Sequence, residues 1–303
     1  MKRIDAHLHV AEVVAGYCRR GELRAIGAGK VMWGNGEVFQ LFPEEYGDTN
    51  FTIEAALSLM KAEGVAKAVL MQGSMYGFQN QYHAKILKKY ADVFCPSCTV
   101  DPYMSNHLET LQMYLTQQNF RLVKFEVSSG GGLMGCHEPF SLVSKRMMKI
   151  YDLIEARGAI LALDVGDLTM ESHQPEALLE IAKTHPKMKL VICHLLAPVI
   201  GREKEWEQSI HLLNKQNICF DLAALPKILN EKVYPYPEVA NFLRKAKDML
   251  GTKKLLWGTD APFAITKDSY SRLKTYIEDS DIFSKEELED IYYNNANQLY
   301  FQK

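Results

Sequence analysis

The sequence predicts an α/β protein, a (β/α)₈ barrel with a long insertion after the first strand and an extra C-terminal helix. Eight apolar, β-branched runs alternate with segments of helical period, and 303 residues suit one large α/β domain. Near-continuous apolar strands that are each followed by a helix indicate a parallel sheet covered on both faces. Eight such units favour a barrel over a doubly wound sheet, whose glycine fingerprint is missing after the first run.

The apolar runs place the eight expected strands at residues 2–10, 66–72, 93–100, 121–127, 159–165, 189–195, 218–222 and 254–260. Three segments between them repeat apolar residues at helical spacing: Leu108, Leu111 and Leu115; Met147, Ile150, Tyr151 and Ile154; and, after Pro175, Leu178, Ile181 and Ala182. The last segment, 284–300, is expected to form the extra helix. We expect residues 1–303 to form a single domain.

Residues 11–50 separate the first strand from the first helix and hold seven of the 19 glycines together with Trp33. A connection of this length is uncommon unless it is functional, so we expect a cap or substrate loop there. Trp33 is the candidate substrate contact of this loop. Aromatic side chains packed over the site would favour a flat, unsaturated substrate.

Composition narrows the class of protein. The 35 basic and 37 acidic residues give a net charge of -2, which argues against a nucleic-acid or membrane-surface partner. No apolar stretch approaches the roughly 18 residues of a membrane span, and the N-terminus has no apolar signal core. Six cysteines are a low density, which indicates reduced thiols. We therefore expect a cytoplasmic protein that acts on a small molecule.

The first expected strand ends in two histidines, His7 and His9. Residues two apart share one face of a strand, and active sites of such barrels lie at the carboxyl ends of the strands. Two imidazoles that converge there suit a zinc- or manganese-like ion. A hydrogen-bonded pair of core histidines is the alternative.

Four further apolar runs stop at an ionisable residue: Glu126, Asp164, His194 and Asp260. A charge at such a point is unfavourable unless it is paired, hydrogen-bonded or bound to a metal. His7, His9, Glu126, Asp164, His194 and Asp260 are therefore candidate site residues, and a metal ion is one of the three kinds of partner that would stabilise them. Lys124 lies in phase with Glu126 and is expected either to meet substrate or to neutralise a buried charge.

Weaker signals follow three of the strands. A glycine-rich segment at 128–135 could bind an anion through its backbone amides or act as a lid, and His137 beside it is a candidate general acid. His173 is a candidate substrate contact, and Asp221 could orient substrate or serve a structural hydrogen bond. The remaining histidines on helical segments (His83, His107, His185 and His211) are expected at the surface or at helix ends. Cys95 and Cys98 have redox spacing, but they fall in a strand without a second pair and are expected to be structural.

The histidine pair, His194 and the run 258–262 (GTDAP) together resemble the amidohydrolase superfamily. The closer resemblance is to its amidohydrolase-related branch, which includes lactonases and non-oxidative decarboxylases of aromatic or unsaturated acids; the ending 288–296 fits too. The resemblance implies that His7 and His9 bind metal and that Asp260 is a ligand that exchanges a proton with metal-bound water. It also implies that His194 binds metal or polarises the substrate. Asp164 stands where the family usually has a histidine, and as a metal ligand its carboxylate would favour a harder ion.

Some superfamily members bridge two metals with a carboxylated lysine or a glutamate on the fourth strand, which makes Lys124 or Glu126 the counterpart here. One or two zinc or manganese ions are thus implied. We expect a metal-dependent hydrolase of a small, carboxylate-bearing ester, lactone or amide, with Asp260, His194 and His137 in catalytic roles. The alternatives are a decarboxylase of a hydroxylated aromatic or muconate-like acid, and a metal-free barrel that binds ligand without turnover. Family analogy also implies a homodimer.

Overall fold

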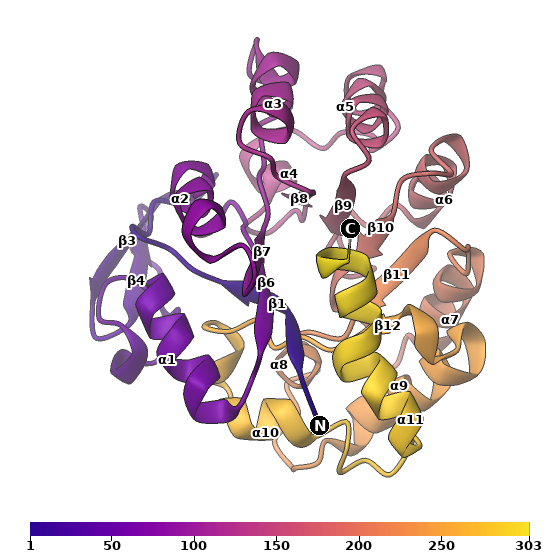
Figure 1. The fold of residues 1–303 in the computed structure, drawn as a ribbon. Coiled ribbons are helices and arrows are strands. Elements are labelled where there is room, and N and C mark those ends of the chain that lie inside the picture. The colour runs from indigo at the N-terminus through magenta and orange to yellow at the C-terminus, as the bar shows by residue number, and fades with distance from the viewer. Residues whose placement is uncertain (303) are drawn as a thin grey trace.

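The computed structural model describes residues 1–302, and eight parallel strands form its barrel (Figure 1). The strands are β1 (Ile4–His9), β6 (Lys67–Met71), β7 (Phe94–Pro96), β8 (Leu122–Glu126), β9 (Ile160–Asp164), β10 (Leu190–Ile192), β11 (Ile218–Asp221) and β12 (Leu255–Leu256). They pair in the orders β1-β6-β7 and β12-β11-β10-β9-β8. Isolated bridges between Cys98 and Val123 and between Leu8 and Ala261 join the two sheets. The predicted (β/α)₈ barrel is confirmed.

Two strands are shorter than their apolar runs predict. The run at 189–195 ends as a strand at Ile192, because the backbone turns left-handed from His194 onward (φ 58°). The run at 254–260 is a strand only over Leu255–Leu256, although Asp260 N–H still donates to the His7 carbonyl at 2.7 Å. The prediction that His194 continues its strand is therefore wrong, and both departures lie at the carboxyl end of the barrel.

Helices cover the outside of the barrel (Figure 1). They are α1 (Ile53–Glu63), α2 (Asn80–Tyr90), α3 (His107–Thr116), α5 (Lys145–Ala156), α6 (Pro175–Thr184), α7 (Glu203–Leu212), α9 (Pro237–Leu250) and α10 (Tyr270–Thr275), with the short α4 (Leu133–Cys136) and α8 (Leu225–Ile228) in loops. Short 3₁₀ segments are η1 (Glu44–Tyr46), η2 (Cys193–Leu196), η3 (Thr252–Lys254) and η4 (Ala264–Thr266). The predicted apolar faces of α5 and α6 are buried, which fixes the rotation of each helix against the sheet.

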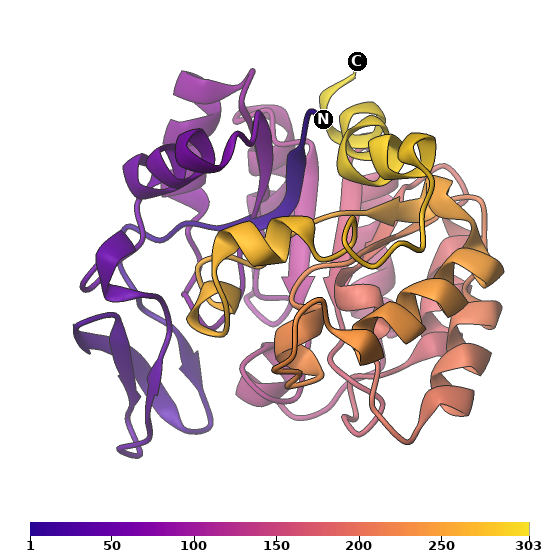
Figure 2. The ribbon, with the colours of Figure 1, turned by 90° about the horizontal axis from the view of Figure 1, so that it is seen from below.

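The extra C-terminal helix closes the amino end of the barrel. It runs through α11 (Lys285–Glu289) and the π-helical segments η5 (Asp290–Asn294) and η6 (Asn297–Phe301). Its Ala296 and Tyr300 pack in one cluster with Ile4, Leu122 and other residues of the barrel interior. Figure 2 shows both termini at this end and the inserted sheet toward the opposite end. The other end of the barrel is thus the one left for a site.

The insertion at 11–50 contains an antiparallel sheet that its sequence pattern does not indicate. Its strands, in the order β2-β3-β4-β5, are β2 (Tyr17–Cys18), β3 (Gly21–Gly27), β4 (Lys30–Trp33) and β5 (Val38–Gln40). One face of the sheet contributes Leu23, Val31 and Trp33 to an apolar cluster that also contains Tyr76 from the loop after β6. We call residues 11–50 the cap.

The six cysteines are all free thiols, as expected. Within residues 1–302, no helix combines the length and the apolar character that a membrane crossing needs.

Candidate metal centre and active site

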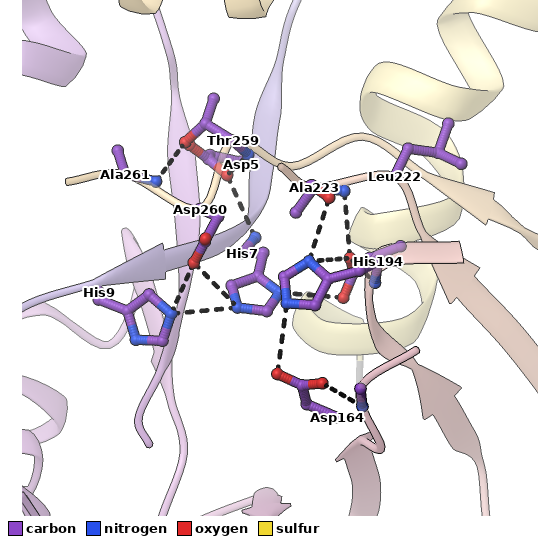
Figure 3. A network of polar contacts seen from close by, with 12 residues as sticks. Asp5, His7, His9, Asp164, His194, Leu222, Ala223, Thr259, Asp260 and Ala261 are labelled. Atoms are coloured by element: carbon purple, nitrogen blue, oxygen red, sulfur yellow. Dashed lines mark hydrogen bonds and ion pairs between the residues drawn. The ribbon is translucent and has the colours of Figure 1, made fainter. Parts of the chain in front are cut away.

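Two histidines and an aspartate converge at the carboxyl end of the barrel (Figure 3). His7 and His9 end β1, and their Nε2 atoms lie 3.1 Å apart. Asp260 Oδ1 lies 2.9 Å from His9 Nε2 and 3.6 Å from His7 Nε2. All three residues are buried. The predicted sharing of one strand face thus brings three donor atoms to one point.

The outer nitrogens of the two imidazoles differ in their surroundings. His7 Nδ1 lies 3.0 Å from Asp221 Oδ2, so this nitrogen carries the proton and Nε2 keeps its lone pair. Burial lowers the pKa of His9 to about 4, although Asp260 opposes the shift. His9 is therefore neutral, its Nδ1 has no partner, and its ring stacks on Tyr76 with centroids 4.8 Å apart.

Asp5 fastens the histidine strand to the segment that carries Asp260. Its carboxylate accepts hydrogen bonds from Thr259 Oγ1 at 2.6 Å, from Tyr270 Oη at 2.7 Å, and from the backbone N–H groups of Thr259 and His7. Burial raises the pKa of Asp5 to about 6 in spite of these bonds. Asp5 is fully buried and was not singled out from the sequence. Its hydrogen bonds hold the strand that carries His7 against the segment that carries Asp260.

His194 reaches the site from a left-handed turn. Residues 194–197 all have positive φ, and the carbonyl of Leu195 accepts the indole N–H of Trp206 at 2.9 Å. His194 Nδ1 donates to the Ala223 carbonyl at 3.1 Å, and Nε2 lies 3.5 Å from Asp164 Oδ2 (Figure 3). Burial alone would lower the pKa of His194, but Asp164 and other carboxylates raise it to about 10. The imidazole is therefore protonated at neutral pH.

Lys124 and Glu126 both face this end of the barrel, as their phase on β8 predicts. Burial raises the pKa of Glu126, while the neighbouring Lys124 opposes the shift. Burial would also lower the pKa of Lys124, but Glu126 and Asp164 hold it above its ordinary value. Gly73 makes room for Glu126, because a Cβ at Gly73 would lie 2.1 Å from Glu126 Oε2.

These groups line a cavity of about 460 Å³. Its wall also carries two cations that the sequence did not single out: Arg20 from the cap and Lys227 from α8. Lys227 Nζ lies 2.7 Å from Thr266 Oγ1 and 3.8 Å from the ring centre of Phe263, another wall residue. The sequence gives little indication that these two residues line the cavity, because the positions of the cap and of α8 do not follow from the pattern of strands. The cavity thus combines metal-type donors with positive charge.

The other predicted site residues lie elsewhere. Asp221 sits behind His7 and does not line the cavity. Trp33 is buried in the cap cluster, and His137 pairs with Asp101 at 2.9 Å outside the cavity. His173 lines a separate hollow of about 410 Å³ beside α7. Of the eleven site residues proposed from sequence, those that do line the main cavity are His7, His9, Lys124, Glu126, Asp164, His194 and Asp260.

His83 corrects another expectation. It lies on α2 but is fully buried, with Nδ1 2.8 Å from the carbonyl of Ser97. The helical pattern placed it at the surface or a helix end, and that prediction is wrong. His185, by contrast, is the C-cap residue directly after α6, as expected, although it too is buried.

The donors fit a divalent ion of borderline hardness. Two imidazole nitrogens and one carboxylate oxygen are ligand types that zinc binds. Among the described residues, Glu126 and Asp164 join none of the groups of three donors whose atoms lie within 4.8 Å of one another. A second such group, His7, His194 and Asp221, uses the outer side of His7 and contains the cationic His194. The arrangement therefore fits one ion held by His7, His9 and Asp260.

Known proteins resemble the chain in sequence and in fold. The amidohydrolase family profile matches residues 4–302. An L-fucono-1,5-lactonase from Burkholderia ambifaria is 31% identical over 117 residues, 34% of this chain. That match spans only 37% of the relative's own length.

Two solved structures match over nearly the whole chain. A zinc-bound amidohydrolase from Burkholderia multivorans has a TM-score of 0.74 and 14% identity and covers 100% of both chains. A probable 2-pyrone-4,6-dicarboxylic acid hydrolase from Acinetobacter baumannii, with citric acid bound, has a TM-score of 0.71 and 17% identity and covers 99% of both. At these identities the likeness supports the barrel fold and does not by itself assign a substrate.

Proposed function

Because this chain belongs to the amidohydrolase family, we propose that it is a metal-dependent hydrolase that opens a small, carboxylate-bearing lactone or ester. The observation that carries the proposal is the convergence of His7 Nε2, His9 Nε2 and Asp260 Oδ1 in one cavity. These three residues would hold a zinc or manganese ion. Such an ion lowers the pKa of bound water from 15.7 to about 7 and so supplies a nucleophile at neutral pH.

The remaining polar groups divide the proton chemistry between them. Burial opposes ionisation of Asp260, but His9, His7 and His194 hold the pKa of its carboxyl below the ordinary value. Asp260 is therefore a carboxylate that can accept a proton from the attacking water. His194, protonated and hydrogen-bonded to Ala223, can donate to the substrate carbonyl oxygen.

Three cations support an anionic substrate, although the wall also carries the carboxylates of Glu126, Asp164, Asp167 and Asp260. Lys124, Arg20 and Lys227 reach the cavity from β8, the cap and α8 respectively. Cations that line a pocket from separate elements favour a ligand with a carboxylate at its rim. The names of two relatives agree with this chemistry, since one is a lactonase and the other is named for hydrolysis of a pyrone dicarboxylic acid.

The test combines metal content with turnover. Protein purified without chelators is analysed for metals, and hydrolysis of L-fucono-1,5-lactone and 2-pyrone-4,6-dicarboxylate is followed by proton release. We expect about one equivalent of zinc or manganese, lost in His9→Ala and retained in Glu126→Ala. His107→Ala, outside the site on α3, is the matched control and should keep metal and activity.

Three outcomes would contradict different parts of the proposal, the first of them only the single-ion site and not the hydrolase. Two equivalents of metal that fall to one in Glu126→Ala would make Glu126 a bridge between two ions. Release of carbon dioxide from an aromatic acid, without lactone opening, would replace the hydrolase by a decarboxylase. Protein that takes up no metal on reconstitution would remove the metal-activated water.

A further inference from the structure

We propose that Asp5, Thr259 and Tyr270 are positioning residues that hold the carboxylate of Asp260 beside His9, in place for a metal ion. This inference rests on the proposed function and explains how its ligand group is kept together. Within residues 1–302, the three residues are not among those that line the cavity, and all three are buried. They therefore act through Asp260 and do not touch the substrate.

The strand that carries the two histidines lies directly against the segment that carries Asp260. Asp260 N–H donates to the His7 carbonyl at 2.7 Å, and His9 N–H donates to the Ala261 carbonyl at 2.7 Å. The two backbones are close enough that a Cβ at Gly258 would lie 2.9 Å from the Cβ of His7. Because the segments are in contact before and after Asp260, a small shift of one segment changes the distance between the imidazoles and the carboxylate.

Asp260 itself has an uncommon backbone conformation. Its φ is 63°, in the left-handed region, which a residue with a side chain keeps only where its surroundings hold it. In this conformation Asp260 Oδ1 lies 2.9 Å from His9 Nε2. A change of φ to one of the commoner regions would turn the Cα–Cβ bond in another direction. The contact with His9 therefore depends on the groups that hold the backbone of Asp260.

Thr259 holds the backbone on both sides of Asp260 (Figure 3). Its Oγ1 donates to Asp5 Oδ2 at 2.6 Å and accepts the Ala261 N–H at 3.1 Å. The N–H of Thr259 donates to Asp5 Oδ1 at 2.9 Å. A single threonine thus ties the residues before and after the left-handed position to one buried carboxylate.

Asp5 is in turn held by α10 and by its own strand. Tyr270, the first residue of α10, donates from Oη to Asp5 Oδ2 at 2.7 Å, and the His7 N–H donates to Oδ1 at 3.1 Å. With the two bonds from Thr259, the fully buried carboxylate accepts four hydrogen bonds. A buried acceptor with these donors cannot turn without leaving a donor unpaired. Asp5 is therefore the fixed point to which the turn at Asp260 is attached.

The experiment compares Thr259→Val with Thr259→Ser. Valine has nearly the shape of threonine but removes both hydrogen bonds of Oγ1, whereas serine keeps the hydroxyl. Crystal structures of the metal-free proteins give the position of Asp260, and competition with a chromophoric chelator gives the zinc affinity. In Thr259→Val we expect the distance from His9 Nε2 to Asp260 Oδ1 to exceed about 3.2 Å, and zinc to bind about 10–100-fold more weakly. Thr259→Ser should match the wild type in both measurements.

Tyr292→Phe is the matched control for a lost buried hydrogen bond. Tyr292, in η5 at the amino end of the barrel, donates from Oη to the Lys274 carbonyl at 2.7 Å. Tyr292→Phe should lower the melting temperature and leave the zinc affinity unchanged. Tyr270→Phe removes one of the four bonds to Asp5 and should weaken zinc binding less than Thr259→Val does. If Thr259→Val does not fold, Tyr270→Phe takes its place, and an unchanged zinc affinity with an unmoved Asp260 overturns the inference.

The outcomes separate this inference from the proposed function. If the wild-type protein binds zinc and opens a lactone, but Thr259→Val keeps the wild-type position of Asp260 or the wild-type zinc affinity, the positioning role is overturned and the function stands. Equal losses in Thr259→Ser and Thr259→Val, or weaker zinc binding in Tyr292→Phe, also overturn it. If the wild type binds no zinc, the proposed function fails and the metal-free crystal structures decide. A displaced Asp260 in Thr259→Val then supports the positioning role, and an unmoved Asp260 overturns it.

Discussion

Asp221 and His7 form a fully buried pair in which the Oδ2 atom of the carboxylate lies 3.0 Å from Nδ1 of the imidazole. The other oxygen of Asp221 accepts the backbone N–H of His194 at 2.8 Å. One carboxylate at the end of β11 therefore fixes the tautomer of a metal-type histidine on β1 and the start of the turn that carries His194. It connects two groups that would act on different atoms of the substrate.

Removing the charge of Asp221 should weaken metal binding. Carboxylate partners of metal-binding histidines typically contribute 10–100-fold to affinity, so we expect Asp221→Asn to reduce zinc affinity by about that factor. Competition with a chromophoric chelator measures it. Asp152→Asn breaks a His–Asp pair of the same 3.0 Å length with His185, away from the cavity, and should leave zinc affinity unchanged. Equal affinity in both variants would show that Asp221 does not support the metal.

Gly73→Ala should displace Glu126 without unfolding the protein. The new Cβ would lie 2.1 Å from Glu126 Oε2, the end of a side chain that can rotate away. We expect Gly73→Ala to reproduce the activity of Glu126→Gln, whatever that activity is. Gly130→Ala, where a Cβ meets nothing within 4 Å, should behave as wild type. Activity of Gly73→Ala that matches wild type while Glu126→Gln is impaired would mean that the position of Glu126 is not critical.

Lys227→Met should separate anionic from neutral substrates. Lys227 lies at the cavity wall, and burial lowers its pKa although the charge of Asp260 opposes the shift. A lost charge-assisted hydrogen bond is worth about 1.5–3 kcal/mol, so KM for a carboxylate-bearing lactone should rise at least about tenfold. Steady-state kinetics on a neutral lactone should show no such rise, and Lys267→Met, whose amine contacts Asn230 instead, serves as the control. An equal rise in KM for the carboxylate-bearing and the neutral lactone would show that Lys227 does not recognise the charge of the substrate.

The buried His83 should make the protein less stable in mild acid. Burial lowers the pKa of His83 to about 4, whereas an unfolded histidine has a pKa near 6.5. Between these values the unfolded chain binds a proton that the folded protein excludes, so stability falls as pH decreases from about 6.5 to 4. The expected loss from this residue is about 2 kcal/mol between pH 7 and pH 5.

Urea unfolding at both pH values tests this expectation with His83→Asn. The asparagine amide can still donate to the Ser97 carbonyl that His83 Nδ1 contacts, and it carries no titrating group. The variant should lose less stability on acidification than wild type, whatever its stability at pH 7. His211→Asn, exposed on α7, should keep the wild-type difference. An unchanged difference in His83→Asn would show that His83 does not drive the acid sensitivity.

The barrel and the strand-end residues could be predicted because both follow from chain periodicity. His7, His9, Glu126 and Asp164 stand at the last positions of strands, and parallel strands of a barrel bring such positions to one rim. His194 reaches the same rim by a left-handed turn, which the pattern of apolar residues along the strand cannot reveal.

Residues from loops could not be placed in the same way. Tyr76 and Lys227 line the cavity because of contacts between segments far apart in the chain, such as the loop after β6 with the cap. The cap illustrates the same limit. Its glycines suggested a loop, but the segment forms an antiparallel sheet, and Trp33 is buried in the apolar cluster of the cap and not at the cavity. His83 was placed wrongly because helical period does not reveal that its side chain hydrogen-bonds to the carbonyl of Ser97, the residue after β7.

The left-handed turn of residues 194–197 has a consequence for attempts to make the protein more heat resistant. Four consecutive residues without a glycine hold positive φ there, and each left-handed residue with a side chain is disfavoured by about 1–2 kcal/mol. Glycine at Ala197 would relieve part of that strain, so a selection for thermal tolerance alone should favour it. The same change would let the backbone of the turn adopt other conformations, and the imidazole of His194 would then be positioned less precisely. This stretch is therefore where an engineer would have to trade melting temperature against turnover.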